Sequence, residues 1–266
     1  MELSFESLTS GLQVDPSGLD RLISGMSPAD RKYIILFTPR SGSSWLTALI
    51  SATRCLGFPE EWLNPELLPN VARAMNCTER ASFLPALLRK CKTDNGVFGM
   101  EARFIDIRIF GEQDFFDGIG DNTQYFYLWR DNIVAQGVSL YKAITTGKFH
   151  STDGRAENVP IIYDCAGIRQ WIEHILNIEN DNLSLVCKRR LPCRFLRYED
   201  IIRDETVTLE TFTFPVLGRP LSDSGVLDTA IPTRLADNWN LEAELRFRHE
   251  MAEFVRDLRQ RRLIKK

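Results

Sequence analysis

The chain has no long hydrophobic run, no excess of positive charge and little histidine. Its 266 residues include 3 His, and 33 Lys and Arg face 36 Asp and Glu, which gives a formal net charge of -3. This balance provides no overall attraction for nucleic acid or for an anionic membrane, so a polyanionic ligand needs a local group of cations. The apolar runs are short, and the run 34–37 is far below the roughly 18 residues of a membrane helix.

Targeting signals and metal-binding patterns are missing as well. Residues 1–20 contain Glu2, Glu6 and Asp15 and lack both a basic start and an apolar segment, unlike a secretory signal. The 6 Cys are scattered, without a C-x-x-C pair or the spacing of a zinc site, which indicates reduced, mostly buried thiols. We therefore expect a cytoplasmic protein without a metal site, and peripheral contact with a membrane stays open.

The composition is that of a soluble globular chain, with 44% hydrophobic and 26% charged residues. Runs rich in β-branched and aromatic residues alternate with segments of helical period, which is typical of a mainly parallel sheet with helices on both faces. We expect strands at 32–38, 97–102, 125–129 and 193–198, and helices at 44–54, 82–92, 133–145, 165–178 and 240–262. Since no linker or repeat divides the chain, one α/β domain is expected over residues 1–266.

The most informative segment is 38–45, Thr-Pro-Arg-Ser-Gly-Ser-Ser-Trp, between the first strand and its helix. At such a junction the backbone N–H groups and the positive helix end converge and form an anion site. The serines add hydroxyl donors, the glycine permits close approach and the arginine adds a cation. A Walker A lysine is absent, which disfavours magnesium-dependent hydrolysis of a nucleoside triphosphate. An ordinary turn with capping serines is the alternative.

This loop resembles the 5′-phosphosulfate-binding loop of sulfotransferases, which use 3′-phosphoadenosine 5′-phosphosulfate (PAPS). The segment 46–64 is similar to the L-x-x-x-L-x-A-T-G-x-x-G-x-P-x-E-[FW]-[FL] stretch of the bacterial carbohydrate sulfotransferases of the trehalose 2-sulfotransferase type, with Arg54 in place of the usual glycine. The resemblance implies a three-layer P-loop-like fold with a mainly parallel central sheet flanked by helices. It assigns PAPS binding to Arg40, Ser41, Gly42, Ser43, Ser44 and Trp45.

A second motif follows the expected strand 125–129. Arg130 leaves the carboxyl edge of the sheet, where α/β folds bind nucleotides, and its planar fork can hold a phosphate. The segment resembles the family's 3′-phosphate site, R-[DP]-x-x-x-x-Q-[AG]-x-S, with Gln136, Gly137 and Ser139 in place. Taken alone, Arg130 would be interpreted as a surface ion-pair residue.

Three further basic segments lie nearer the C-terminus. Arg234, in the segment 232–239, is a further candidate for binding the nucleotide phosphate. Arg197 belongs to an R-Y-E-D sequence that also resembles the family, and we expect it to be structural. The run 259–266 is interpreted as a solvated helix end.

The chemistry needs a base for the acceptor hydroxyl and donors that stabilise the departing phosphate. None of the histidines, at 150, 174 and 249, lies in a motif. Glu61 matches the family's general base, the second residue after Pro59, whereas Glu60 is expected to face solvent. The resemblance therefore implies that Glu61 takes the proton, and that Arg40 with the amides of 41–44 stabilises the leaving 3′-phosphoadenosine 5′-phosphate (PAP). A glutamate at a helix start is the alternative.

One position departs from the family. The sequence 96–101 resembles the G-x-[FW]-G-x-K strand, but Glu101 stands where lysine is usual. A missing cation should weaken donor binding or transfer unless Arg103 or Arg108 reaches the same place. A nucleotide-binding protein without transfer activity therefore stays open, as does a small-molecule kinase.

The acceptor implied by the resemblance is a hydroxyl of a carbohydrate or glycolipid. Trp45, Trp62 and the polar loop 147–160 are candidates for sugar stacking and a lid, although either tryptophan also fits the core. Members of the family form homodimers, and nothing in the sequence identifies an interface. No nucleic-acid partner is expected.

Overall fold

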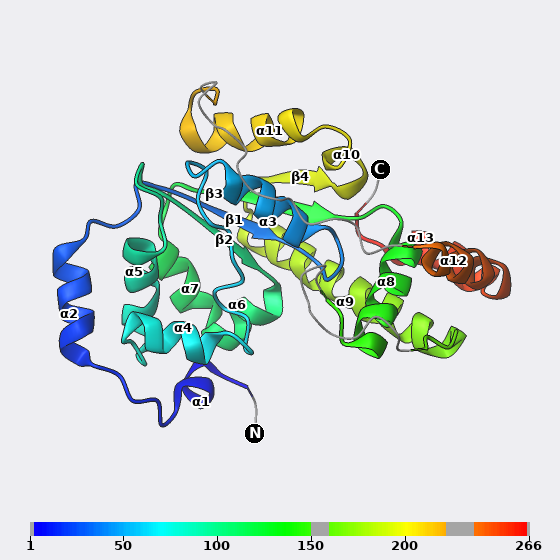
Figure 1. Cartoon of the computed structure of the whole chain (residues 1–266), viewed down its shortest axis with the longest axis horizontal. Helices are drawn as coiled ribbons and strands as arrows, with labels where there is room; N and C mark the ends of the chain where they lie inside the picture. The colour runs from blue at the N-terminus through cyan, green and yellow to red at the C-terminus, as the bar shows by residue number, and fades with distance from the viewer. Residues whose placement is uncertain (1–2, 150–159, 222–236, 265–266) are drawn as a thin grey trace.

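The computed structural model describes residues 3–149, 160–221 and 237–264, and Figure 1 shows the whole chain. Within those residues one sheet of four strands has the order β2-β1-β3-β4, and every pair is parallel. The strands are β1 (Arg31–Leu36), β2 (Val97–Ala102), β3 (Thr123–Trp129) and β4 (Cys193–Arg197). All the expected strands are present, which confirms the α/β class and the parallel sheet.

Helices fill the connections and both ends of the described chain. They are α1 (Phe5–Thr9), α2 (Pro16–Gly25), α3 (Ser43–Ala52), α4 (Leu68–Met75), α5 (Arg80–Lys90), α6 (Phe104–Phe110), α7 (Glu112–Ile119), α8 (Ile133–Thr146), α9 (Cys165–Arg189), α10 (Tyr198–Ile201), α11 (Glu205–Leu217), α12 (Asn238–Glu250) and α13 (Ala252–Arg261). Each expected helix is present, and two predictions of helix bounds are wrong. α9 continues to Arg189, and the helix expected at 240–262 is divided at Met251, whose φ of -116° and ψ of 35° leave the helical region.

The sheet lies between two layers of helices because its side chains alternate. Tyr33 and Ile35 of β1 pack with α3 and α11, while Ile34 and Leu36 pack with the layer that contains α4 to α7 and part of α9. Figure 1 shows α11 and the group α4 to α7 on opposite sides of the strands. A third cluster joins α8, α9, α12 and α13. The burial of these apolar side chains, about 1.5–3 kcal/mol for each large one, stabilises the layered arrangement.

The strand order creates a switch point between β1 and β3. From β1 the chain passes to β2 on one side, and from β2 it returns across β1 to β3 on the other. In open α/β sheets, ligands bind at the carboxyl ends of the strands at such a point. The segments that follow β1 and β3, at 37–42 and 130–132, are therefore neighbours at the carboxyl edge of the sheet.

Four further expectations concern the cysteines, membrane-spanning helices, Arg234 and the loop 147–160. All the cysteines are free thiols. Cys77 is buried, Cys187 is exposed and the others are half-buried, so the prediction of mostly buried thiols is wrong. Among the described helices, none combines the length and the apolar character needed to span a bilayer. Arg234 and most of the loop 147–160, with its histidine, lie outside the described residues.

Candidate functional site

The turn between β1 and α3 has the backbone geometry of an anion site. The Ser41 amide donates to Thr38 O at 3.2 Å, and Gly42, with φ 91°, is the N-cap residue of α3. Gly42 has no side chain, and no side chain in the described part of the protein caps the first turn. The N–H groups of that turn therefore keep the positive end of the helix dipole available to an anion.

Gly42 is required by the ring of Tyr198 as well as by its φ angle. A Cβ at position 42 would lie 2.5 Å from Tyr198 Cδ2, so the ring packs directly against the turn. The Arg130 guanidinium lies over the same ring, 4.6 Å from its centroid, which is a cation–π contact. Tyr198, the first residue of α10, thereby supports both the turn after β1 and the arginine after β3.

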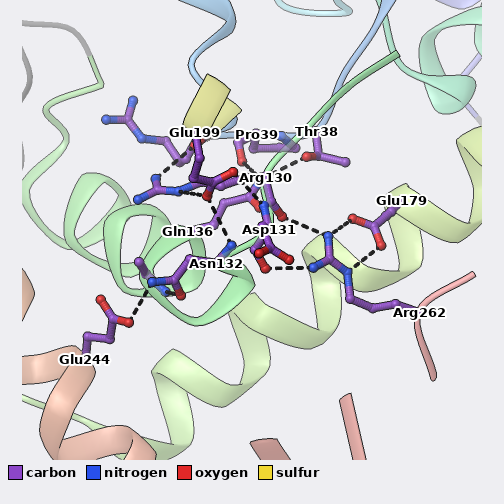
Figure 2. Close-up of polar contacts among 12 residues, drawn as sticks. Thr38, Pro39, Arg130, Asp131, Asn132, Gln136, Glu179, Glu199, Glu244 and Arg262 are labelled. Carbon is purple, nitrogen blue, oxygen red and sulfur yellow. Dashed lines mark hydrogen bonds and ion pairs between the residues drawn. The ribbon is translucent and has the colours of Figure 1, made fainter. Parts of the chain in front are cut away.

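Gln136 of α8 ties the turn to the second motif. Its side chain is fully buried, and its Nε2 donates to Thr38 Oγ1 at 2.8 Å and to Pro39 O at 2.7 Å, as Figure 2 shows. A Cβ on the next residue, Gly137, would overlap the side chain of Ile172 on α9. The glutamine is needed for its two hydrogen bonds to the turn, and the glycine is needed because α9 leaves no room for a side chain.

Arg40, Arg130 and Ser139 come together at the carboxyl edge. Arg40 Nε donates to Ser139 Oγ at 3.1 Å, and Arg40 Nη1 donates to Phe149 O at 2.6 Å. Arg130 Nη1 lies 3.4 Å from Arg40 O, to which it donates. Arg40 has a φ of 63°, a region that few arginines occupy, so the turn aims its side chain across the sheet edge. The two cations predicted from separate motifs are thus neighbours.

Glu199 holds the turn after β3. Its carboxylate accepts hydrogen bonds from the amides of Asp131 (3.0 Å) and Asn132 (3.2 Å) and lies 4.0 Å from Arg130 Nε (Figure 2). Asn132 caps α8 by accepting from the Ala135 amide at 3.0 Å. A half-buried carboxylate of the R-Y-E-D sequence therefore fixes the direction in which Arg130 leaves the strand.

Arg262 departs from the interpretation of 259–266 as a solvated helix end, whereas residues 259–261, the end of α13, are exposed as predicted. Arg262 is 7% exposed, and its Nη2 pairs with Glu179 Oε2 at 2.5 Å on α9. Its guanidinium also donates to Asp131 O and Arg130 O, both at 2.8 Å (Figure 2). The partner carboxylate lies 83 residues earlier, so the local charge pattern of the C-terminal run gives no sign of it. Arg262 fixes the backbone of the turn after β3.

Glu61 is half-buried in the segment between α3 and α4. Its Oε2 accepts a hydrogen bond from Asn64 Nδ2 at 2.9 Å, which orients the carboxylate. Glu60 is exposed, as predicted. Burial acts to lower the pKa of Arg103, but its contacts with Asp106 and the nearby charge of Glu61 raise it. Arg103 thus lies within electrostatic reach of Glu61, at the end of β2.

Glu101 is buried at the point where the family's lysine is expected. It is 3% exposed, and its Oε1 lies within hydrogen-bond distance of Thr47 Oγ1, at 2.8 Å. Burial raises the pKa of Glu101 well above its ordinary value, and the charge of Glu61 adds to that rise. Arg103 binds Asp106 through two hydrogen bonds, at 2.8 and 2.7 Å, so its fork is held by that carboxylate, while Arg108 is exposed.

The remaining candidates have mixed surroundings. Trp62 Nε1 donates to Gly99 O at 3.2 Å, and both Trp62 and Trp45 are partly buried against core clusters. Arg197 pairs with Asp200 at 2.7 Å, which agrees with a structural role. Burial lowers the pKa of His174 on α9, and the charge of Arg103 adds to the effect.

Sequence reasoning missed four residues that build the site. Tyr198 and Glu199 belong to a sequence already noted for its family resemblance, so that resemblance was the available signal for them. Glu179 and Arg262 contact each other over a long separation and carry no local signature. Within the described residues, no three His, Cys, Asp or Glu side chains are grouped so that they could hold a metal ion.

Comparisons with known proteins give no family for the chain. The sequence matches no family model and shows no significant match to a curated protein.

Proposed function

We propose that this protein is a PAPS-dependent sulfotransferase that acts on a hydroxyl of a carbohydrate or glycolipid acceptor. The observation that supports it most strongly is the contact between Arg40 and Ser139, with Arg130 bonded to the Arg40 carbonyl. Two motifs far apart in sequence, each resembling one phosphate site of the same nucleotide, meet at the switch point of the sheet. A donor with charged groups at both ends needs such a pair of sites.

The first turn of α3 and the serines of the loop are suited to the 5′-phosphosulfate end. The Ser41 side chain is fully buried, and its Oγ has no hydrogen-bond partner among the described residues. A buried hydroxyl without a partner is costly, and an anion oxygen would satisfy it. Ser43, Ser44 and Arg40 supply further donors. Arg130 and Ser139 would hold the 3′-phosphate, which is the group that distinguishes PAPS from ATP.

The proposed reaction moves a neutral sulfuryl group between two oxygens. PAPS supplies this group in an activated form. Glu61 accepts the proton of the acceptor hydroxyl, a new bond joins that oxygen to sulfur, and the bond between sulfur and the 5′-phosphate oxygen breaks. Arg40 and the N–H groups at the start of α3 stabilise the negative charge that remains on PAP. Asn64 keeps the Glu61 carboxylate in one orientation for the proton transfer.

A second candidate function is supported by Glu101. A buried carboxyl where the resembling family has lysine removes one cation from the donor site, and the neighbouring Arg103 is bound to Asp106. A protein that binds PAP or PAPS without transfer would tolerate that loss. The two functions differ in turnover and share the nucleotide site.

A transfer assay distinguishes them. The protein is incubated with radiolabelled PAPS and a panel of sugars, oligosaccharides and glycolipids, trehalose included, and labelled products are separated. We expect label in an acceptor and release of PAP. Glu61→Gln should abolish transfer and leave PAP affinity unchanged. Glu60→Gln, which removes an exposed charge next in sequence, is the matched control and should retain activity. PAP binding without any labelled acceptor would support the binding protein, and absence of PAP binding would contradict both.

A further inference from the structure

We propose that Glu101 is a positioning residue that acts as a protonated carboxylic acid beneath the first turn of α3, and that binding of an anion at that turn is coupled to its proton. The inference rests on the anion site of the proposed function. It adds that this site is controlled by a residue that the sulfotransferase resemblance does not provide.

The position of Glu101 connects it to the turn. It lies opposite Ile35 in the register of β2 and β1, one residue before the end of β2. Its carboxyl reaches α3, where Thr47 Oγ1 lies 2.8 Å from Oε1. Ser43 is the first residue of α3. The carboxyl of Glu101 therefore contacts a residue one helical turn after Ser43, whose amide belongs to the proposed anion site.

A count of hydrogens favours the neutral acid. Thr47 Oγ1 lies 3.1 Å from Pro59 O and 2.8 Å from Glu101 Oε1, but a hydroxyl has one hydrogen. The Pro59 carbonyl can only accept. If Thr47 donates to it, the shorter contact needs a hydrogen from Glu101. If Glu101 is protonated, each of the two contacts of Thr47 Oγ1 contains its own hydrogen. If Glu101 is a carboxylate, the single hydrogen of Thr47 must serve both contacts.

The surroundings of Glu101 provide little to stabilise a negative charge. The polar and titratable groups that face it come from β1, from α3 and from the segment after Pro59: Tyr33, Ser43, Thr47, Glu60 and Glu61. None of these groups is a cation, and two are carboxylates. Burial and the charge of Glu61 raise the pKa of Glu101 by more than Thr47 and Ser43 lower it, and this net rise agrees with the hydrogen count.

The coupling follows from charge. When Glu101 is neutral, an anion at the α3 turn meets the helix dipole and the nearby arginine. When the pH rises through the raised pKa of Glu101, a negative charge forms in a buried position under the same turn and opposes the anion. Anion affinity should then fall by up to about tenfold per pH unit, since each bound anion requires one proton on Glu101.

The test measures PAP binding by calorimetry from about pH 6 to about pH 9, in two buffers of different ionisation enthalpy, for the wild type and Glu101→Gln. For the wild type we expect affinity to fall at the alkaline end, with net proton uptake on binding. Glu101→Gln keeps the hydrogen bonds of the neutral acid. At every pH it should bind PAP with the affinity that the wild type has at the acidic end of the range. The titration of PAP itself is common to both proteins and cancels in the comparison.

Glu66→Gln is the matched control, because it removes an exposed carboxylate from the same segment that is not among the groups facing Glu101, and it should keep the wild-type pH dependence. Equal pH profiles and equal proton uptake in the wild type and Glu101→Gln would overturn the inference and leave the proposed function intact. Failure of the wild type to bind PAP would overturn the proposed function instead. Infrared spectroscopy decides the protonation of Glu101 in either case. A protonated carboxyl band at neutral pH, shifted in Thr47→Val, is expected, and its absence contradicts the inference.

Discussion

Arg40 Nε donates a hydrogen bond to Ser139 Oγ at 3.1 Å, and the two residues lie 99 positions apart in the chain. One follows the first strand, and the other lies on the helix that follows the third. Their contact joins two segments that each resemble a phosphate site, so a nucleotide with phosphates at both ends would contact a single connected group of donors. The Gln136 side chain, which donates to Thr38 and Pro39, fixes the spacing between the segments.

Replacement of Ser139 should weaken PAP binding. Ser139→Ala removes a hydroxyl that positions Arg40 and would donate to the 3′-phosphate. Hydrogen bonds to charged groups contribute about 1.5–3 kcal/mol, so we expect the Kd for PAP to rise about tenfold or more. Calorimetric titration measures it. Ser184→Ala is the matched control, since that hydroxyl bonds only a carbonyl of its own helix on an exposed face. Equal affinities in the two variants would contradict a role of Ser139 in nucleotide binding.

Replacement of Gly42 should disturb both halves of the site. In Gly42→Ala the new methyl group meets the Tyr198 ring, and a φ of 91° is unfavourable for alanine. We expect a loss of about 1–3 kcal/mol in unfolding free energy and weaker PAP binding, because Tyr198 also supports Arg130. Urea unfolding and PAP titration provide the two values. Gly25→Ala, at a position with open space around it, is the control. Unchanged PAP affinity in Gly42→Ala would show that the turn does not contact the nucleotide.

Loss of Arg262 should destabilise the fold. Arg262→Met leaves the fully buried Glu179 without its cation and frees the carbonyls of Arg130 and Asp131. Removal of one partner from a buried pair costs about 3–5 kcal/mol. Urea unfolding of this variant is compared with that of Arg259→Ala, an exposed neighbour expected to change stability by less than about 0.5 kcal/mol. The double variant Arg262→Met/Glu179→Gln should recover part of the loss, and no recovery would argue against the pair.

The stability of the protein should also depend on Glu101 as the pH rises above 4.5, the ordinary pKa of a glutamate. The pKa of Glu101 is raised on folding, so its contribution to stability is complete below the pKa of the unfolded chain and is lost as the pH rises through the folded pKa. The free energy of unfolding of the wild type should therefore fall with rising pH relative to Glu101→Gln. Urea titrations of both proteins from about pH 5 upward give the difference, and a difference that does not change with pH would contradict the assignment.

The parts of the fold that follow from local sequence were predicted best. The apolar segment within 32–38 and the run 97–102 form buried strands, and the Gly-Ser turn after the first of them begins a helix. The break at Met251 was missed because the apolar periodicity continues on both sides of it. The burial of Arg262 was not predicted because the C-terminal run is strongly polar, and its partner Glu179 is brought near only by tertiary packing.

Within the site, the motifs predicted which residues take part, whereas the contacts among those residues are determined by the fold. The family resemblance predicted Arg40, Arg130 and Ser139. Their contact follows from the strand order, which no local sequence pattern predicts. The departure at Glu101 was visible as an acidic residue in place of lysine. Its burial and its contact with Thr47 depend on how α3 crosses the sheet. Such cross-element contacts determine whether a charge is tolerated, and no local pattern encodes them.

The central claim is tested most directly by thermal unfolding of the wild type in the presence of PAP and, separately, of 5′-AMP, which lacks the 3′-phosphate. A ligand at about one hundred times its Kd stabilises the folded state by about 2.7 kcal/mol, which raises the Tm of a protein of this size by about 5 °C or more. We predict such a rise for PAP and a much smaller one for 5′-AMP at the same concentration. No rise at saturating PAP, or equal rises for the two nucleotides, would contradict the account.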